Sequence, residues 1–203
     1  MTRHRFRTVK ILRPLALVVA GAALVALGPQ GSAVTLAQKS LFTTVDRKTC
    51  KTLRAHPDGN AYLCPGLKGF PIYLAEGDGR TFVASSTAPE KSQAATQTLA
   101  AFNTPFLHQS ERATVEWRFT IKNERQVPFA MIVRFFTQND DGKGEVLVVT
   151  RISGREACHV AYVDALANPD AIVLARKIAD DRARTFDCAT HASVEGTRGQ
   201  SPM

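Results

Sequence analysis

The fold is decided by residues 114–164, which read TVEWRFTIKNERQVPFAMIVRFFTQNDDGKGEVLVVTRISGREACHVAYVD. The stretch opens at 114–122 with a strict alternation of polar and apolar side chains. Successive side chains of a strand point to opposite faces, so this period of two predicts a strand with one face in a core and the other in water. Its apolar face carries Val115, Trp117, Phe119 and Ile121.

The next strand is predicted over 127–137 and is apolar on both faces. Val127, Phe129, Met131, Val133 and Phe135 are expected to share one face, and Ala130, Ile132 and Phe136 the other. We therefore expect other elements to cover both faces of this strand. Arg134 is the exception, and it indicates either an edge position or a buried pair with an acid.

Two more strands are predicted over 146–152 and 157–163. The turn residues Ser153-Gly154-Arg155-Glu156 join them, and Asn139-Asp140-Asp141-Gly142 precedes the first of the two. Turn-forming residues between apolar runs are hairpin signals, so consecutive strands are expected to pair in antiparallel fashion. A further hairpin of 72–75 with 81–84 is expected around 76–80.

Three helices are predicted outside the strands. Thr87 with Glu90 resembles a capping box, and a helix starting there places Ala95, Leu99 and Phe102 on one face. A short helix is also expected over 46–56. The third is predicted over 168–185, with Asn168 as its cap and Pro169 in its first position.

These elements predict an α+β fold. It is expected to be an antiparallel meander of about five to six strands with a C-terminal helix packed on the sheet, one or two short N-terminal helices, and disulfides that staple it. The domain is expected over 46–188, after a linker over 34–45 and before a disordered tail over 189–203.

Residues 1–33 have the pattern of a cleavable export signal. Five cationic side chains precede an apolar core at 15–27, and Gly31-Ser32-Ala33 offers small residues for cleavage, with Ala37 as an alternative site. A retained anchor is the weaker interpretation, because about 20 apolar residues are needed to span a bilayer. We therefore expect a periplasmic or secreted protein without a stable membrane span after cleavage.

Much of the positive charge belongs to this signal. The whole chain has a formal charge of +8, but five of its 26 Lys and Arg residues and none of its 18 acidic residues lie in 1–33. The remainder carries +3, which is too little to indicate binding to nucleic acid or to an anionic membrane.

The four cysteines all follow the signal, and an even number in an exported chain predicts disulfides. Three pairings are possible. We favour Cys50 with Cys64 and Cys158 with Cys188, because each pair brackets one compact unit. A zinc site is not indicated, since the chain has no Cys-x-x-Cys and no histidine at a matching interval.

Catalytic and cofactor-binding motifs are missing from the sequence. It contains neither a Gly-x-Ser-x-Gly elbow nor a phosphate-binding glycine loop, and we predict no catalytic residue, cofactor or metal site. The best pocket hypothesis joins His159, Tyr162 and Asp164 at the end of the last strand, together with Arg134. The alternative is a core tyrosine with a loop-closing acid.

The sequence therefore favours an exported, non-catalytic envelope module that binds a protein, peptide or glycan. Two alternatives stay open. One is a small secreted hydrolase in which Asp78, His108, His159 and Asp164 converge in space. The other is a small-molecule carrier with an internal cavity.

Overall fold

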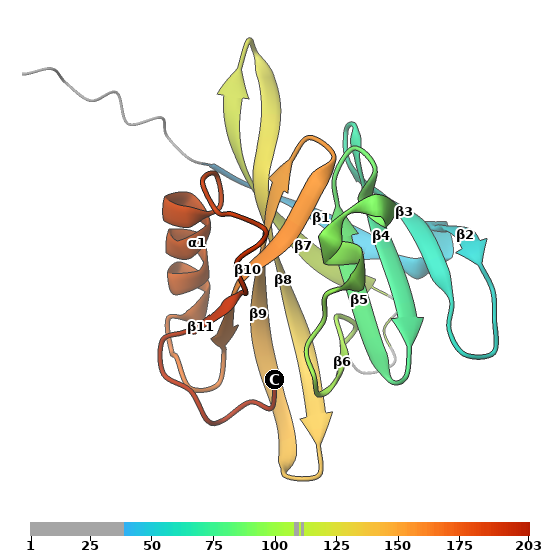
Figure 1. Ribbon diagram of the computed structural model, residues 1–203, viewed down its shortest axis with the longest axis vertical. Coiled ribbons are helices and arrows are strands. Elements are labelled where there is room, and N and C mark those ends of the chain that lie inside the picture. The colour runs from blue at the N-terminus through green and yellow to red at the C-terminus, as the bar shows by residue number, and fades with distance from the viewer. Residues whose placement is uncertain (1–38, 108–109, 111) are drawn as a thin grey trace, which may run out of the picture. The chain divides into compact units, whose positions relative to one another are not determined.

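A computed structural model describes residues 39–107, 110 and 112–203 of the chain (Figure 1). The predicted export signal and His108 lie outside these residues. Two β-sheets and one α-helix account for most of the described chain. The structure thus confirms a β-rich α+β fold with a C-terminal helix and two disulfides.

The larger sheet has seven strands. Its path is β1 (Lys39–Asp46), β7 (Arg112–Lys122), β8 (Arg125–Asn139), β9 (Gly142–Ser153), β10 (Glu156–Asp164) and β11 (Ser193–Glu195), and β6 (Phe102–Thr104) also pairs with β8. Pairing is antiparallel except between β10 and β11, which are parallel. The expected simple meander is therefore wrong: consecutive hairpins make only β7 to β10, and distant segments supply the other strands.

The smaller sheet has four strands, in the order β2 (Lys51–Arg54), β3 (Ala61–Leu67), β4 (Phe70–Gly77) and β5 (Arg80–Ser85). The predicted hairpin of 72–75 with 81–84 lies within β4 and β5. The helix expected over 46–56 is not present. Instead, Asp46 caps a single 3-10 turn at Arg47–Thr49, and β2 follows it directly. β-branched Thr49 and Thr52 favour this outcome over a helix.

The helix expected over 87–102 is also wrong. Two 3-10 turns, Pro89–Lys91 and Gln93–Thr96, take its place. Side chains in this segment bond to backbone groups instead of leaving them to a helix. Ser92 Oγ donates to the Pro89 carbonyl (2.7 Å), and Thr98 Oγ1 donates to the Thr81 carbonyl (2.7 Å).

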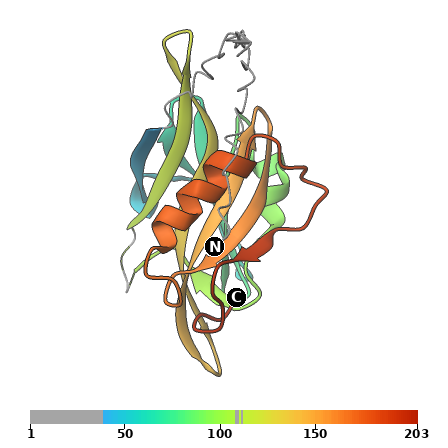
Figure 2. The same cartoon turned by 90° about the vertical axis from the view of Figure 1, so that its left-hand side faces the viewer.

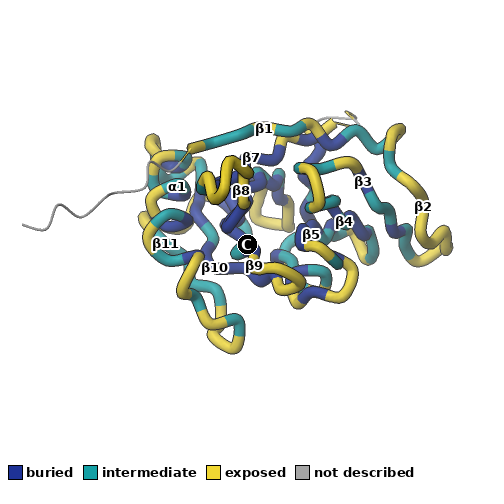
Figure 3. Tube along the Cα trace, turned by 90° about the horizontal axis from the view of Figure 1, so that it is seen from above, coloured by how far each residue is buried: buried dark blue, intermediate teal, exposed yellow. Residues whose placement is uncertain are grey.

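The larger sheet lies between two layers, as expected for a central strand that is apolar on both faces. Helix α1 (Ala171–Arg182) packs on one face against β8, β9 and β10 (Figure 2), and the smaller sheet covers the other face (Figure 3). Trp117, Met131 and Val148 belong to the core beside the smaller sheet. Ile132 and Val149 belong to the core beneath α1.

A bulge between β7 and β8 alters one predicted face. Arg118 lies opposite Ala130, but the next residue, Phe119, lies opposite Pro128, so Phe129 is the extra residue. Phe129 therefore joins the core beneath α1, where the Arg184 guanidinium lies 3.5 Å from its ring centroid. The sequence pattern had placed Phe129 on the same face as Met131, because periodicity does not detect a bulge.

The two ends of the domain are more ordered than expected. The predicted linker contributes β1 from Lys39 on, and the predicted disordered tail contributes β11. Asn168 holds this tail: its side-chain amide donates to the Thr197 carbonyl (2.8 Å) and accepts from the Thr197 amide (3.0 Å). Asn168 was expected to cap α1, but Asp170 occupies that position.

Both favoured disulfides are confirmed. Cys50–Cys64 joins the residue just before β2 to β3, and Cys158–Cys188 joins β10 to the segment after α1. Within the described residues, no helix has the length and hydropathy needed to cross a membrane.

Candidate functional site

His159 and Tyr162, two members of the predicted pocket, do come together. Strict alternation along β10 would place them on opposite faces. A bulge at Val160 changes this, because His159 lies opposite Thr150 and the next paired residue, Ala161, lies opposite Val149. Both side chains therefore face the smaller sheet, and His159 Nδ1 lies 3.0 Å from the Tyr162 hydroxyl. Gln97 holds the bulge, because its Oε1 accepts a bond from the His159 amide (2.8 Å).

This pair is poorly suited to proton transfer near neutral pH. His159 is 2% exposed, and burial lowers its pKa to about 4. Burial also raises the pKa of the Tyr162 hydroxyl. Both groups are thus neutral at pH 7, and a general base works best with a pKa near the working pH. Their packing fits a structural role.

Asp164 closes the loop at the end of β10. Its carboxylate accepts five hydrogen bonds, from the amides of Leu166, Ala167, Gln200 and Ser201 and from the Ser201 hydroxyl. Burial acts to raise the pKa of Asp164, but the bonds from Ser201, Gln200 and Ala167 outweigh it, so the pKa is lowered. The carboxylate therefore anchors the C-terminal segment, as the loop-closing alternative predicts.

Arg134 lies apart from this cluster. It pairs across the strands with Glu145, and both side chains are partly exposed. Arg134 lies opposite Leu147 of the core beneath α1, so it occupies the other face of the sheet from His159 and Tyr162. The structure thus divides the predicted pocket between two faces.

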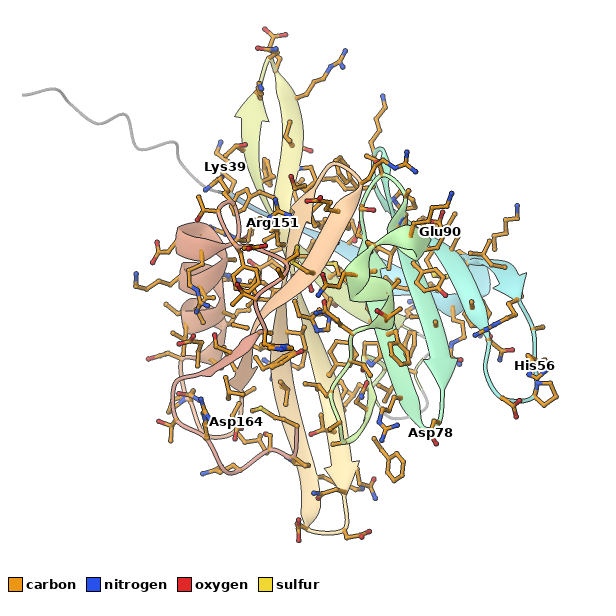
Figure 4. The ribbon with its side chains drawn as sticks, viewed as in Figure 1. Lys39, His56, Asp78, Glu90, Arg151 and Asp164 are labelled. Atoms are coloured by element: carbon orange, nitrogen blue, oxygen red, sulfur yellow. A yellow bond between two sulfur atoms is a disulfide. The ribbon has the colours of Figure 1, made fainter. Side chains whose placement is uncertain are left out.

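Of the four residues proposed for a hydrolase, the three that the structure describes are not assembled into one site either. Asp78 lies on the exposed β4–β5 turn, where it pairs with Arg80 (2.6 Å), while Asp164 lies beside the C-terminal segment (Figure 4). His159 is buried with Tyr162. The described residues also contain no group of three potential metal ligands from His, Cys, Asp and Glu.

A groove of about 470 Å³ opens where the end of β8 meets the start of β9. Four parts of the chain line it: the β4–β5 turn, β6 with the residues after it, the ends of β8 and β9 that meet at their hairpin, and the loop after β10. The lining residues are Gly79, 102–104, 106–107, 136–138, 143–145 and 166. Phe102, Leu107 and Leu166 are exposed apolar residues in this lining. The groove is therefore open to solvent and partly apolar.

Sheet register builds the floor of this groove. Phe102 lies opposite Gln138, which lies opposite Lys143, and this row crosses β6, β8 and β9. The adjacent row is Thr104, Phe136 and Glu145. Residues directly opposite each other in an antiparallel sheet project to the same face, so these two rows form one surface.

Buried Asn103 and exposed Gly79 shape the groove at its edge. Asn103 Oδ1 accepts a bond from the Thr81 amide (3.1 Å) and its Nδ2 donates to the Ala101 carbonyl (2.9 Å), so it ties β6 to β5. Gly79 has a φ of +70°, and a Cβ there would lie 2.6 Å from the Phe102 ring. Only glycine leaves room for the Phe102 ring at this turn.

The groove is not predicted by the sequence patterns, although one signal was present. The Asn139–Gly142 turn sets the register that places Gln138 opposite Lys143. No local pattern indicates that 102–104 joins the same sheet, and the helix predicted from Thr87 extended to Phe102. The aromatic part of the groove depends on that long-range pairing.

Comparisons with known proteins add no functional assignment. No family model, curated protein or solved structure matches this chain.

Proposed function

We propose that the protein is an exported, non-catalytic binding module that holds a small, partly apolar ligand in the groove. The observation that carries this proposal is an open groove of about 470 Å³ in which exposed Phe102 shares a sheet face with polar Gln138 and Lys143. Ligand sites of small molecules have volumes of about 300 to 1,000 Å³ and combine apolar walls with a few polar groups.

Three further features support this proposal. The two disulfides suit an oxidising compartment, which agrees with the pattern of residues 1–33. The titratable cluster at β10 is buried and internally hydrogen-bonded, which favours binding over catalysis. The groove is open, so it fits a surface binding site better than a carrier that encloses its ligand.

The binding test uses the neutral fluorescent probe N-phenyl-1-naphthylamine and the processed protein purified from the periplasm of expressing bacteria. Phe102 and Phe42 are matched, with 56% and 57% of their surfaces exposed, but only Phe102 lines the groove. We expect Phe102→Ser to weaken probe binding by about tenfold or more, because a large apolar contact is lost. Phe42→Ser should bind as the parent does, and equal losses in the two variants would contradict the proposal.

The export part has its own test. The intact mass of the same periplasmic protein, after alkylation of free thiols, should correspond to a chain starting near Val34 or Gln38 with no alkyl group added. A chain that keeps residues 1–33, or one found only in the cytoplasm, would contradict export.

A further inference from the structure

The two charged side chains of the groove lining, Lys143 and Glu145, differ in whether they have an ion-pair partner. Lys143 and Glu145 both line the groove from β9 and lie on the same face as Phe102. Arg134 pairs with Glu145, so the carboxylate charge is balanced within the protein. Among the described residues, the Lys143 ammonium makes neither a hydrogen bond nor an ion pair, and the side chain is exposed.

The charged groups of the neighbouring β4–β5 and β8–β9 turns lie outside the groove lining. Asp78 pairs with Arg80, and the Asp141 carboxylate accepts a bond from the Asn139 side chain within the β8–β9 turn (3.2 Å). The lining itself therefore presents one unpaired cation next to an exposed phenyl ring. A ligand that complements both has an apolar body and an anionic group.

We infer that the groove selects a small amphipathic organic anion, with an aromatic or aliphatic body against Phe102 and Leu166 and one carboxylate or similar anionic group at Lys143. This inference rests on the proposed function and adds the ligand class to it. Gln138 lies between Phe102 and Lys143 in the cross-strand row, so its amide is placed to bond the anionic group as well.

The test compares two probes that share one ring system: neutral N-phenyl-1-naphthylamine and 8-anilino-1-naphthalenesulfonate, which adds a sulfonate. We expect the sulfonate to bind about fivefold more tightly at low salt, since an exposed ion pair contributes modestly. Lys143→Gln should remove this preference, while Lys143→Arg should retain it. Lys122→Gln is the control, because Lys122 ends β7 opposite Arg125, at the end of β8 that lies away from the groove.

A second variant changes the charge balance without touching Lys143. Arg134→Gln leaves Glu145 unpaired in the lining, so the sulfonate should bind more weakly while the neutral probe is unaffected. Equal binding of both probes to the parent protein, or a preference that Lys143→Gln leaves intact, would overturn the anion inference. Neither result affects the proposed function, which fails if Phe102→Ser leaves binding of the neutral probe unchanged or weakens it no more than Phe42→Ser does.

Discussion

The polar groups of the β10 cluster and those of the groove differ in whether they have partners inside the protein. In the β10 cluster of His159, Tyr162 and Asp164, nearly every group has a partner inside the protein. In the groove, the apolar side chains of Phe102, Leu107 and Leu166 are exposed, and the ammonium of Lys143 has no partner among the residues that the structure describes. Titratable residues that lie close together in a sequence are thus explained by hydrogen bonds within the protein as well as by chemistry on a ligand.

The difference has a physical basis. Removing a polar group from water is costly unless the protein replaces its hydrogen bonds, so a buried cluster is stable only when its members satisfy one another. Such a cluster has little capacity left for a ligand. A groove keeps that capacity because solvent satisfies its polar groups until a ligand arrives.

The largest expected effect concerns Asp164. Asp164→Ala removes the acceptor of five hydrogen bonds and leaves the backbone amides of 166, 167, 200 and 201 without it. We expect the free energy of unfolding to fall by about 4 kcal/mol, as for other buried networks that lose one partner. Urea denaturation measures this loss.

Asp170→Ala is the control for Asp164. Asp170 is exposed and makes no side-chain capping bond to α1, so its removal should change stability by less than about 0.5 kcal/mol. Asp170→Ala should also leave probe binding in the groove unchanged, because Asp170 does not line it. A cost below about 1 kcal/mol for Asp164→Ala would show that the C-terminal segment is not anchored by this carboxylate.

The next effect is the pH dependence caused by His159. Its pKa is about 4 in the folded protein and 6.5 in the unfolded chain, so the unfolded chain binds more protons between these values. The contribution to stability is complete above about pH 6.5 and declines as the pH falls. About 3 kcal/mol should be lost by pH 4 relative to pH 7.

The measurement is the free energy of unfolding from pH 7 to pH 4 for the parent and for His159→Gln. The difference between their profiles isolates His159, because the carboxylates are common to both proteins. His56→Gln, which removes an exposed histidine of the β2–β3 loop, should follow the parent profile. Parallel profiles for the parent and His159→Gln would mean that His159 is not buried in solution.

How much the sequence predicted depended on the range of the interactions. Strands β7 to β10 and their turns were predicted, because alternation and turn residues are local signals. The segment 87–102 was assigned to a helix, but its turns depend on bonds such as that between Thr98 and Thr81. Strand β3 gave no signal, since Pro65 and Gly66 interrupt it.

The same limit applies to the candidate site. His159 and Tyr162 meet only because a bulge shifts the register by one residue, and Gln97 from a distant turn holds that bulge. The groove needs β6 beside β8, which brings Phe102 to Gln138 across more than thirty residues of chain. Most apolar residues predicted for the faces of β7 and β8 are buried, but Ile121 and Val127, near the hairpin that joins these strands, are exposed. The assembly of residues into a site was not predictable from local periodicity.

The smallest expected effect compares one buried hydroxyl from each region. Thr150 lies opposite His159 and is 1% exposed, and Thr137 lines the groove and is 3% exposed. Within the described residues, neither Oγ1 has a hydrogen-bond partner. Replacing an unpaired buried hydroxyl with a methyl group removes a desolvation cost, so Thr150→Val and Thr137→Val should each raise the free energy of unfolding by about 1 kcal/mol.

Urea denaturation of the two variants tests whether water is excluded from the Thr137 hydroxyl in the groove wall as it is from the β10 cluster. Equal gains would show that both hydroxyls are shielded and that solvent in the groove stops at Phe102 and Lys143. A gain for Thr150→Val with a loss for Thr137→Val would contradict this expectation. It would mean that water entering from the groove bonds the Thr137 hydroxyl, and a ligand would then have to displace that water or bond to it.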